Sequence, residues 1–478
     1  MICRACALVL GSIGLALPPA CTGSSREGLG PDGGPATQLS ELDVTAFGAV
    51  PNDDRDDSRA IQRAVDAARD GDVKIVTFPE GTYLVHREVQ LPAGIALLGR
   101  GATLRRPAGM GEFHRLFSTA GAGYTYRGDV DSPPLEIRGF RFDGQSAAQG
   151  AFRDFEKEHQ SCIFLVGDRS RPGRLVAVVE DVEFVNNAAD GVTVHTNVDA
   201  TVRRVRAWDV FRGAVTITGG HSVIRMEDIE AGGDEFPTGI NVEADARGFG
   251  DTRTVAITAR NLRLKGRLYV GLADSATFTG TDITSGPPYK LVARDDAVID
   301  IRSSRFAIGA PLPVQYARDV RFTDVTFRLT DPGPAVSRDT PLTALRIVWR
   351  SQYEPDMRDQ KLECLRCRFL VDSGLRWPGG AMAIETGADQ AALANRLVVR
   401  DSYFGAGFAV AMNMEFGGTW EVRGTEVLAD TAAVLRYRDT AQYPRHFYDV
   451  LFERLPGATA PIAERGPPHA GNRLTIPP

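Results

Sequence analysis

Three short stretches decide the fold: Val192-Thr193-Val194-His195, Val215-Thr216-Ile217-Thr218 and Ile240-Asn241-Val242-Glu243. In each, apolar residues alternate with polar ones, and a strand with that alternation turns its apolar side chains to one face. Stretches of this kind recur eleven times, with first residues from 163 to 434, at a mean spacing of about 27 residues. A repeat of that length is typical of a solenoid, in which each unit packs only on its neighbours.

A second family of strand-like stretches interleaves with the first, for example Val182-Glu183-Phe184 and Val202-Arg203-Arg204-Val205. Turns separate the two families, and no helical pattern recurs between them. This argues against a leucine-rich or an α/β repeat. It favours a parallel β-helix, in which each strand pairs with its equivalent one coil away, about 4.8 Å along the axis.

One amphipathic helix precedes the strands. Its apolar residues Ile61, Ala64, Val65 and Ala68 are spaced three and four apart, and Asp57 or Ser58 begins it, with Gly71 just after its end. The end of a solenoid exposes unpaired strand edges and apolar side chains. We therefore expect this helix to cap the N-terminal end of the coils.

The N-terminus has the pattern of a signal peptide, because Arg4 precedes an apolar stretch. Small residues before Cys21 and a Ser- and Gly-rich segment after it resemble a bacterial lipoprotein signal, so Cys21 is a candidate for lipidation. We predict export to the bacterial cell envelope or the extracellular space. The predicted parts are a signal peptide over 1–21, a flexible tether over 22–40, a single β-helix domain over 41–460 and a C-terminal tail over 461–478. No later apolar run is long enough to span a bilayer.

Charge and cysteine content exclude several classes of function. The 55 Lys and Arg residues against 61 Asp and Glu residues give a net charge of -6, so no basic field favours nucleic acid. Cys162, Cys364 and Cys367 are too few for a disulfide framework. Since Cys364 and Cys367 lie in a strand-like run, we expect half-buried strand residues there and no zinc or redox centre. The oligomeric state stays open.

The N-terminal segment contains three stretches that belong together: residues 44–68, Val76-Thr77-Phe78-Pro79-Glu80-Gly81-Thr82-Tyr83-Leu84 and Leu91-Pro92-Ala93-Gly94-Ile95. They resemble the opening of the pectate-lyase-like superfamily, and the resemblance covers residues 43 to about 105. That superfamily holds polygalacturonases, rhamnogalacturonases, alginate-modifying enzymes and phage tailspikes. The resemblance implies an all-β, right-handed parallel β-helix with a short N-terminal capping helix. It leaves the activity open, because one fold hosts several chemistries.

The site motifs of two groups in that superfamily are missing from this sequence. Polygalacturonases carry Asn-Thr-Asp, Asp-Asp, Gly-His-Gly and Arg-Ile-Lys in that order. The nearest string here is Gly219-Gly220-His221-Ser222-Val223-Ile224-Arg225-Met226, and the paired-aspartate motifs are absent from the expected coils before it. The Asp-Pro-His-Glu motif of alginate epimerases is absent too. Candidate site residues therefore come from the strand faces alone.

The alternation predicts which side chains point outward. If Val192 and Val194 point into the rod, their neighbours point out and stack from coil to coil. The resulting row begins mixed, with Thr193, His195, Thr216, Thr218, Asn241, Glu243 and Tyr269, and continues basic, with Lys290, Arg294 and Arg346. Arginine forks suit carboxylates, so we predict an anionic polysaccharide as partner, bound by Asn241, Lys290 and Arg346. The alternative is a solvated surface of an arginine-rich chain.

The catalytic candidates are Asp190, His195, His221, Glu243, Tyr269 and Arg294. A lyase that acts on a uronate needs a base and a cation that neutralises the carboxylate, roles that suit His195 or Tyr269 with Arg294. A hydrolase needs two carboxylates about 5 to 9.5 Å apart, which would be Asp190 and Glu243. We expect a lyase acting by β-elimination ahead of a hydrolase, with an epimerase or a non-catalytic glycan-binding adhesin as alternatives. No cofactor is predicted; calcium stays open, although no dense acidic cluster falls on this face.

Overall fold

A computed structural model describes the chain from residue 41 onward. Residues 1–40 lie outside the described residues, and with them the predicted signal peptide, the tether and Cys21. Further gaps fall at residues 121–130, 151–156, 158, 169, 171, 235–237, 244–254, 285–289, 310–311, 316–318, 332–338, 340, 349–360, 379, 387–395, 409, 415–418, 430–434, 438–444, 449, 455–473 and 476–478.

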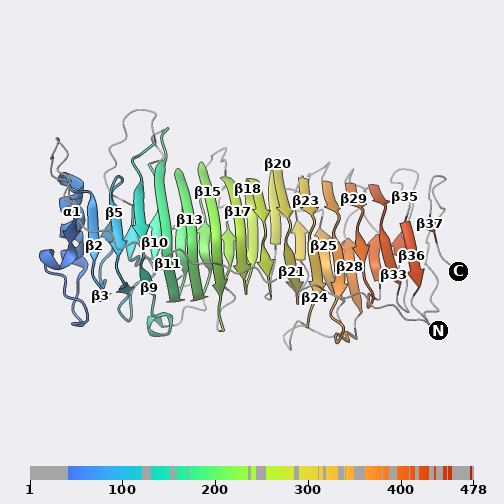
Figure 1. Ribbon diagram of the computed structural model, residues 1–478, viewed down its shortest axis with the longest axis horizontal. Helices are drawn as coiled ribbons and strands as arrows, with labels where there is room; N and C mark the ends of the chain where they lie inside the picture. The colour runs from blue at the N-terminus through green and yellow to red at the C-terminus, as the bar shows by residue number, and fades with distance from the viewer. Residues whose placement is uncertain are drawn as a thin grey trace, which may run out of the picture. The chain divides into compact units, whose positions relative to one another are not determined.

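The described strands stack into three parallel sheets, because each strand pairs with its equivalents in the coils before and after it (Figure 1). Sheet 1 contains β4 (Val89–Gln90), β7 (Phe117–Ser118), β10 (Ile163–Leu165), β12 (Asp190–Val194), β14 (Gly213–Ile217), β16 (Ile240–Val242), β22 (Leu312–Gln315), β25 (Leu342–Val348), β28 (Ala381–Thr386), β31 (Val410–Met414) and β34 (Leu435–Tyr437). Sheet 2 contains β1 (Leu42–Asp43), β2 (Ile75–Phe78), β5 (Ala96–Gly99), β8 (Leu135–Arg138), β23 (Asp319–Thr323), β26 (Lys361–Leu365), β29 (Arg396–Arg400), β32 (Thr419–Arg423) and β35 (Arg445–Tyr448). Sheet 3 contains β3 (Gly81–Leu84), β6 (Ala102–Arg105), β9 (Arg141–Asp143), β19 (Asp282–Ile283), β21 (Arg305–Ile308), β24 (Thr326–Leu329), β27 (Arg368–Val371), β30 (Tyr403–Phe404), β33 (Glu426–Ala429), β36 (Val450–Arg454) and β37 (Leu474–Thr475).

Six long strands turn a corner and belong to two sheets. The strands β18 (Leu268–Thr279) and β20 (Lys290–Arg302) run from sheet 1 into sheet 2. The other four run from sheet 2 into sheet 3: β11 (Leu175–Asn187), β13 (Val198–Val210), β15 (Ser222–Gly232) and β17 (Val255–Leu264). The all-β, right-handed parallel β-helix with a capping helix is confirmed.

A single residue makes the corner between sheets 2 and 3 in ten successive coils. Its backbone φ lies between 47° and 64°, the left-handed region, at Asp181, Arg204, Asp228, Asn261, Gly280, Ser303, Asp324, Arg366, Asp401 and Gly424. One left-handed residue between two extended ones turns the chain without a loop. Because nothing longer than one residue separates the two strands, the sequence pattern shows two strand families where the structure has three sheets.

The inward residues form one continuous apolar core. Val192, Val194, Val215 and Ile217 are buried in it, as the alternation predicts. Phenylalanine rings stack from coil to coil along the inner side of sheet 3, with centroids 4.6 to 5.6 Å apart across Phe306, Phe327, Phe369 and Phe404. Each ring thus packs on its equivalent in the next coil, which excludes water from the interior.

The expectation that Cys364 and Cys367 are half-buried is wrong. Both thiols are fully buried and unbridged. They flank the corner residue Arg366, so both side chains turn inward. Burial raises the pKa of Cys364 well above its ordinary value, which keeps that thiol protonated and unreactive.

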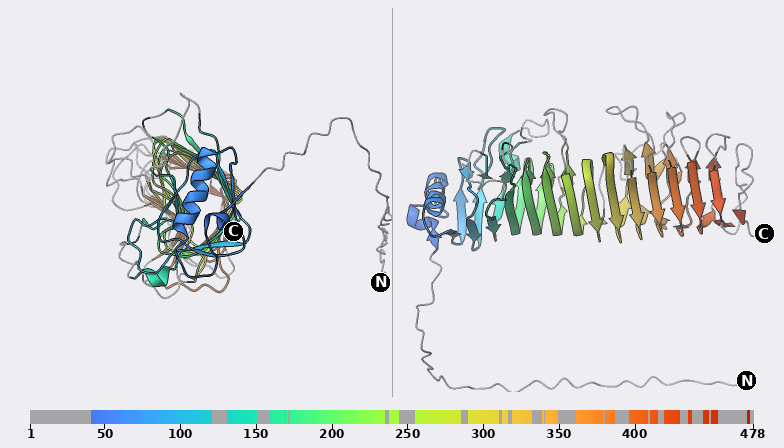
Figure 2. Two further views of the ribbon diagram at one scale, coloured as in Figure 1. Left: turned by 90° about the vertical axis from the view of Figure 1, so that its left-hand side faces the viewer. Right: turned by 90° about the horizontal axis from the view of Figure 1, so that it is seen from above.

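The helix α1 (Ser58–Asp70) lies across the N-terminal end of the coils (Figure 2). Its buried face consists of Ile61, Ala64, Val65 and Ala68, as predicted, and a 3-10 turn, η1 (Val44–Phe47), packs beside it. A second 3-10 turn, η2 (Ser146–Gln149), follows β9. The helix covers the core of the first coils and so provides the cap that the strand edges require.

A fully buried arginine, Arg106, ties three successive coils together at the turn between sheets 3 and 1. Its guanidinium donates hydrogen bonds to the carbonyls of Gly144 (3.2 Å), Gln160 (2.8 Å) and Ser161 (3.0 Å) and to the side-chain oxygen of Asn187. A buried charge is tolerated only where its donors are satisfied. Arg106 therefore has a structural role, because it donates hydrogen bonds to buried carbonyls in the turns between the sheets.

Replacing Arg106 with Met removes the guanidinium donors from these buried acceptors. Among the described residues, only the carbonyls of Gln160 and Gly144 keep a second donor, from Asn187 Nδ2 at 3.1 Å and Gln149 Nε2 at 3.4 Å. We expect Arg106→Met to lower the free energy of unfolding by about 3 to 5 kcal/mol, measured by urea denaturation. The matched control is Arg100→Met, which removes only a surface ion pair with Glu41 (2.8 Å) and should cost less than about 1 kcal/mol. Equal losses in the two variants would contradict the structural role of Arg106.

Candidate functional site

The outer face of sheet 1 carries a row of polar side chains. The register places Thr193, Thr216, Asn241 and Tyr269 side by side on successive coils, as the alternation predicts. Although they point away from the core, Thr193, Thr216 and Asn241 are buried. Polar groups on the outside of a β-helix are ordinarily solvated, so a buried polar row marks a place where other side chains and turns cover the sheet.

Asp190, the first residue of β12, lies beneath this row and is only 1% exposed. Its carboxyl group accepts hydrogen bonds from the hydroxyls of Thr193 (3.0 Å) and Thr216 (2.5 Å), and Arg212 Nε lies 4.0 Å away. Burial raises the pKa of Asp190 and outweighs the opposing effects of Arg212 and the two hydroxyls. A buried titratable group with a charged partner is a recognised marker of a functional site.

Arg212 joins Asp190 to a second carboxylate. Its side chain is 7% exposed, and its Nη2 donates to Glu243 Oε2. Asn241 Nδ2 donates to the other oxygen, Glu243 Oε1, at 2.7 Å. Glu243 itself is 36% exposed. One guanidinium therefore holds two carboxyl groups, of which only Glu243 reaches solvent.

A second arginine, Arg267, supports the first. Its Nε and Nη2 donate to the backbone carbonyl of Arg212 at 3.1 and 2.7 Å. Burial lowers the pKa of Arg267, while the carboxylates of Glu243 and Asp190 oppose that shift, and an arginine keeps its charge across the physiological range. Tyr269, two residues further on, interacts electrostatically with Arg267 and is half-buried.

His195 lies just past the end of β12 on the same face. Its Nδ1 is 3.0 Å from the hydroxyl of Thr218, and its ring stacks on Phe164, with centroids 5.8 Å apart. The guanidinium of Arg115 lies 3.7 Å from the centroid of the Phe164 ring. His195 is half-buried, so its imidazole is fixed by contacts yet partly open to solvent.

The remaining predicted site residues lie elsewhere. His221 is exposed, adopts the left-handed conformation at a turn, and uses its carbonyl to accept from Arg174 (3.1 Å). Arg346 is exposed on β25 and pairs with Glu385 at 3.8 Å, several coils from Asn241. Lys290 and Arg294 belong to β20, and their side chains lie outside the described residues. The structure thus brings Asp190, Asn241 and Glu243 together around Arg212, with Tyr269 beside Arg267. His195 lies on the same face of sheet 1 but contacts Thr218 and Phe164 instead.

Sequence reasoning missed the two arginines that organise the cluster. Arg212 immediately precedes β14, and Arg267 immediately precedes β18. A charged residue directly before a buried strand of sheet 1 is the local signal that marks both of them. Nothing in their spacing of 55 residues predicts that one side chain binds the other's carbonyl.

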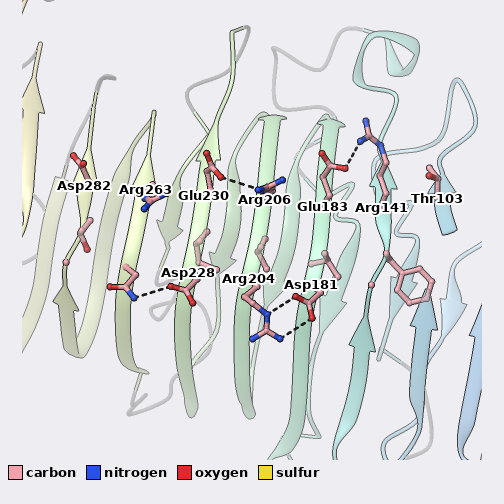
Figure 3. A pocket seen from close by; sticks show the side chains of 18 of the residues that line it. Thr103, Arg141, Asp181, Glu183, Arg204, Arg206, Asp228, Glu230, Arg263 and Asp282 are labelled. Atoms are coloured by element: carbon pink, nitrogen blue, oxygen red, sulfur yellow. Dashed lines mark hydrogen bonds and ion pairs between the residues drawn. The ribbon is translucent and has the colours of Figure 1, made fainter. Parts of the chain in front are cut away.

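A separate groove of about 1060 Å³ runs along the corner between sheets 2 and 3 (Figure 3). Its charged lining consists of Arg141, Arg204, Arg206, Arg263 and Arg305 with Asp181, Glu183, Asp228, Glu230 and Asp282. The charges on sheet 3 alternate in sign along the register from Arg141 to Arg305. At the corner, Arg204 pairs with Asp181 at 2.7 Å. Since Asp190, whose buried carboxyl group has a raised pKa, lies on sheet 1, the sheet 1 cluster is the better candidate for chemistry.

Neither a metal site nor a membrane span emerges from the described residues. Within those ranges, no group of three or more His, Cys, Asp or Glu side chains is arranged to hold a metal ion. No helix in the described part of the chain is long and apolar enough to cross a membrane.

Comparisons with known proteins place this architecture. Residues 42–226 match the family described as rhamnogalacturonase A/epimerase, pectate lyase-like. No curated protein sequence gives a significant match.

Solved structures share the architecture at low sequence identity. A tailspike protein of E. coli bacteriophage HK620, in complex with a pentasaccharide, has a TM-score of 0.50 at 10% identity, over 89% of this chain and 78% of that one. The A-module of an Azotobacter vinelandii mannuronan C-5 epimerase has a TM-score of 0.46 at 12% identity, over 91% and 100%. A Yersinia enterocolitica family 28 exopolygalacturonase has a TM-score of 0.42 at 13% identity, over 87% and 78%. At these identities the likeness concerns the fold alone.

The raised pKa of Asp190 predicts that its contribution to the free energy of unfolding changes with pH. In the unfolded chain an aspartate titrates near 3.9, and the folded protein holds the proton more tightly. As pH rises from about 3.9 through the raised native pKa, the wild type should therefore lose stability relative to Asp190→Asn. Below about 3.9 the difference should not change with pH. Urea unfolding of both proteins across a pH series measures this difference.

A control with the opposite sign is available at Asp324. The guanidinium of Arg366 lowers the pKa of Asp324, so Asp324→Asn should lose stability relative to the wild type as pH rises toward about 3.9. A stability difference for Asp190→Asn that is flat with pH, or that follows the sign of the Asp324 control, would contradict the placement of Asp190.

Proposed function

Because this chain is a pectate-lyase-like parallel β-helix protein, we propose that it is an exported enzyme that cleaves an acidic polysaccharide by β-elimination on the outer face of sheet 1. The observation that carries the proposal is that half-buried Tyr269 interacts with the charged Arg267 beside a buried ionic cluster, while half-buried His195 lies on the same outer face of sheet 1. The matched family supports a uronate-containing substrate, since its description names rhamnogalacturonase. The pentasaccharide bound to the tailspike supports a glycan ligand.

Accessibility favours elimination over hydrolysis. Hydrolysis needs two carboxyl groups that flank the scissile bond. Here Glu243 reaches solvent, but Asp190 is closed off beneath Thr193 and Thr216, which both donate to it. Elimination needs one base and one cation instead, and these roles do not require a second exposed carboxylate.

In the proposed reaction a uronate lies over half-buried Tyr269 on the outer face of sheet 1. Arg267 neutralises the uronate carboxylate, which acidifies the proton on the adjacent ring carbon. Tyr269 or His195 takes that proton, the electron pair forms a double bond in the ring, and the glycosidic C–O bond breaks. The leaving oxygen takes up a proton and becomes the hydroxyl of a new reducing end, while the uronate that lost its proton becomes the unsaturated end of the other fragment. Asp190, Arg212 and Glu243 act as positioning residues that hold Arg267 and Asn241.

A hydrolase is the second candidate, favoured by one observation. Burial raises the pKa of Asp190, and a carboxyl group that keeps its proton suits a general acid. Glu243 would then be the base or the nucleophile. This candidate requires the Thr193 and Thr216 hydroxyls to move away from Asp190 when substrate binds.

The test is digestion of polygalacturonate and alginate by the mature protein, which is the chain without the predicted signal peptide over 1–21. The reaction is monitored by the ultraviolet absorbance of unsaturated uronate and by the release of reducing ends. We expect both signals to rise together. Tyr269→Phe or His195→Ala should reduce the rate by about 10²- to 10⁴-fold, depending on which side chain is the base. Arg267→Met should abolish turnover because the uronate charge is no longer neutralised.

The matched control is Arg225→Met, which removes an exposed arginine from the outer face of sheet 2, where it pairs with Asp199. Its rate should equal that of the wild type. Reducing ends without unsaturation, lost on Asp190→Asn and Glu243→Gln, would reject elimination in favour of hydrolysis. A change in sugar composition with no change in chain length would identify an epimerase, and unchanged polymers would leave a binding role.

A further inference from the structure

An exposed tryptophan stands out on the outer face of sheet 3. Trp208, on β13, is 39% exposed, whereas most large apolar side chains of the described chain are buried in the core. It lies near the corner groove because its strand neighbour two residues earlier, Arg206, lines that groove, and residues two apart share a face. An aromatic ring that is partly exposed beside a polar groove is the side chain that proteins use to stack on sugar rings.

The coil next to Trp208 is shaped to hold the indole in place. The register places Gly232 beside Trp208, and a Cβ atom at Gly232 would come within 3.0 Å of the ring atom Cζ3. The absence of a side chain there lets the six-membered part of the ring approach the backbone. Lys265 Nζ lies 5.6 Å from the ring centroid and 3.2 Å from Asp234 Oδ1. The ring is thus supported from the following coils while part of it stays open to solvent.

The groove beside the ring offers donors and acceptors for hydroxyl groups. Arg206 and Glu230 face each other across adjacent coils at 3.6 Å, and Arg263 follows on the next coil. Arg206 lies two residues before Trp208 on the same strand, and Glu230 and Arg263 take the equivalent position on the next two coils. The polar row and the ring therefore lie about 7 Å apart along the strands. That spacing suits one sugar ring stacked on Trp208 with its neighbour hydrogen-bonded in the groove.

The charge of the groove selects the class of ligand. Its lining holds five arginines and five carboxylates, so it presents no net charge to a polyanion. From the ring, the groove and this balance, we infer that the outer face of sheet 3 is a second glycan-binding surface for a neutral oligosaccharide chain, stacked on Trp208. This inference goes beyond the proposed function and does not depend on it, because binding here requires no cleavage on sheet 1.

The test is affinity electrophoresis of the mature protein through gels that contain galactomannan, xyloglucan or dextran as neutral probes. We expect at least one of these polymers to retard the wild type. Trp208→Ala should weaken that retardation about tenfold in apparent affinity, while Trp208→Phe keeps most of it. Because the contact is uncharged overall, the retardation should persist at about 0.5 M salt.

The matched control is Phe113→Ala, which removes another exposed aromatic side chain that lies outside the groove. It should migrate like the wild type, and the thermal unfolding midpoints of all variants should agree. The inference is overturned if no neutral polymer retards the wild type, or if Trp208→Ala and Phe113→Ala behave alike. Retardation only by polygalacturonate, lost at high salt, would overturn it as well. Product formation on sheet 1 is assayed separately, so each proposal fails on its own readout.

Discussion

Parallel, in-register stacking is the constraint on which the rest of this molecule depends. Equivalent residues on adjacent described coils lie about 4.8 Å apart. The side chains at one position of the coil must therefore pack against the side chains at the same position in the coils before and after. Apolar residues meet this condition by packing, as the stacked rings of Phe327, Phe369 and Phe404 do. Charged residues meet it where their signs alternate, as they do at Glu183 and Arg206. Where like charges stack, as at Lys361 and Arg396, each pairs with a carboxylate of its own, Glu363 or Glu421.

The same constraint explains why the sheet 1 cluster is an exception that calls for a function. A row of Thr193, Thr216 and Asn241 stacks easily, because each of these side chains both donates and accepts. Asp190 and Arg212 do not repeat from coil to coil, and their burial costs free energy that a run of threonines would avoid. Glu243 binds Arg212 there, and Tyr269 lies beside Arg267 on the same outer face.

The parts of the molecule that could be predicted are those that repeat. Alternation at Val192 and Val194 is enough to assign the inside and outside of sheet 1, and the spacing of Ile61, Ala64 and Val65 is enough to place the capping helix. The N-terminal resemblance added the handedness. Within the site, the outward row through Asn241 and Tyr269 follows from the same alternation, because the stacking of coils converts sequence period into spatial neighbourhood.

What could not be predicted comes from side chains that act across coils. Arg106 reaches three turns and Arg267 binds the carbonyl of Arg212, and neither contact has a sequence period. The third sheet could not be distinguished from the second in the sequence, because only a single left-handed residue such as Asp181 or Arg204 separates their strands. The burial of outward-facing residues could not be predicted either. The alternation places Thr216 on the outer face of sheet 1, yet its side chain is buried.

The alternation of charge along sheet 3 has a consequence for how such a rod can change its length. From Arg141 through Glu183, Arg206 and Glu230 to Arg263, each sign is followed by its opposite on the next coil. Loss or duplication of one coil in this region would set two like charges side by side, whereas a change by two coils restores the pattern. In this stretch of the rod, duplications or deletions of an even number of coils should therefore be tolerated better than those of an odd number.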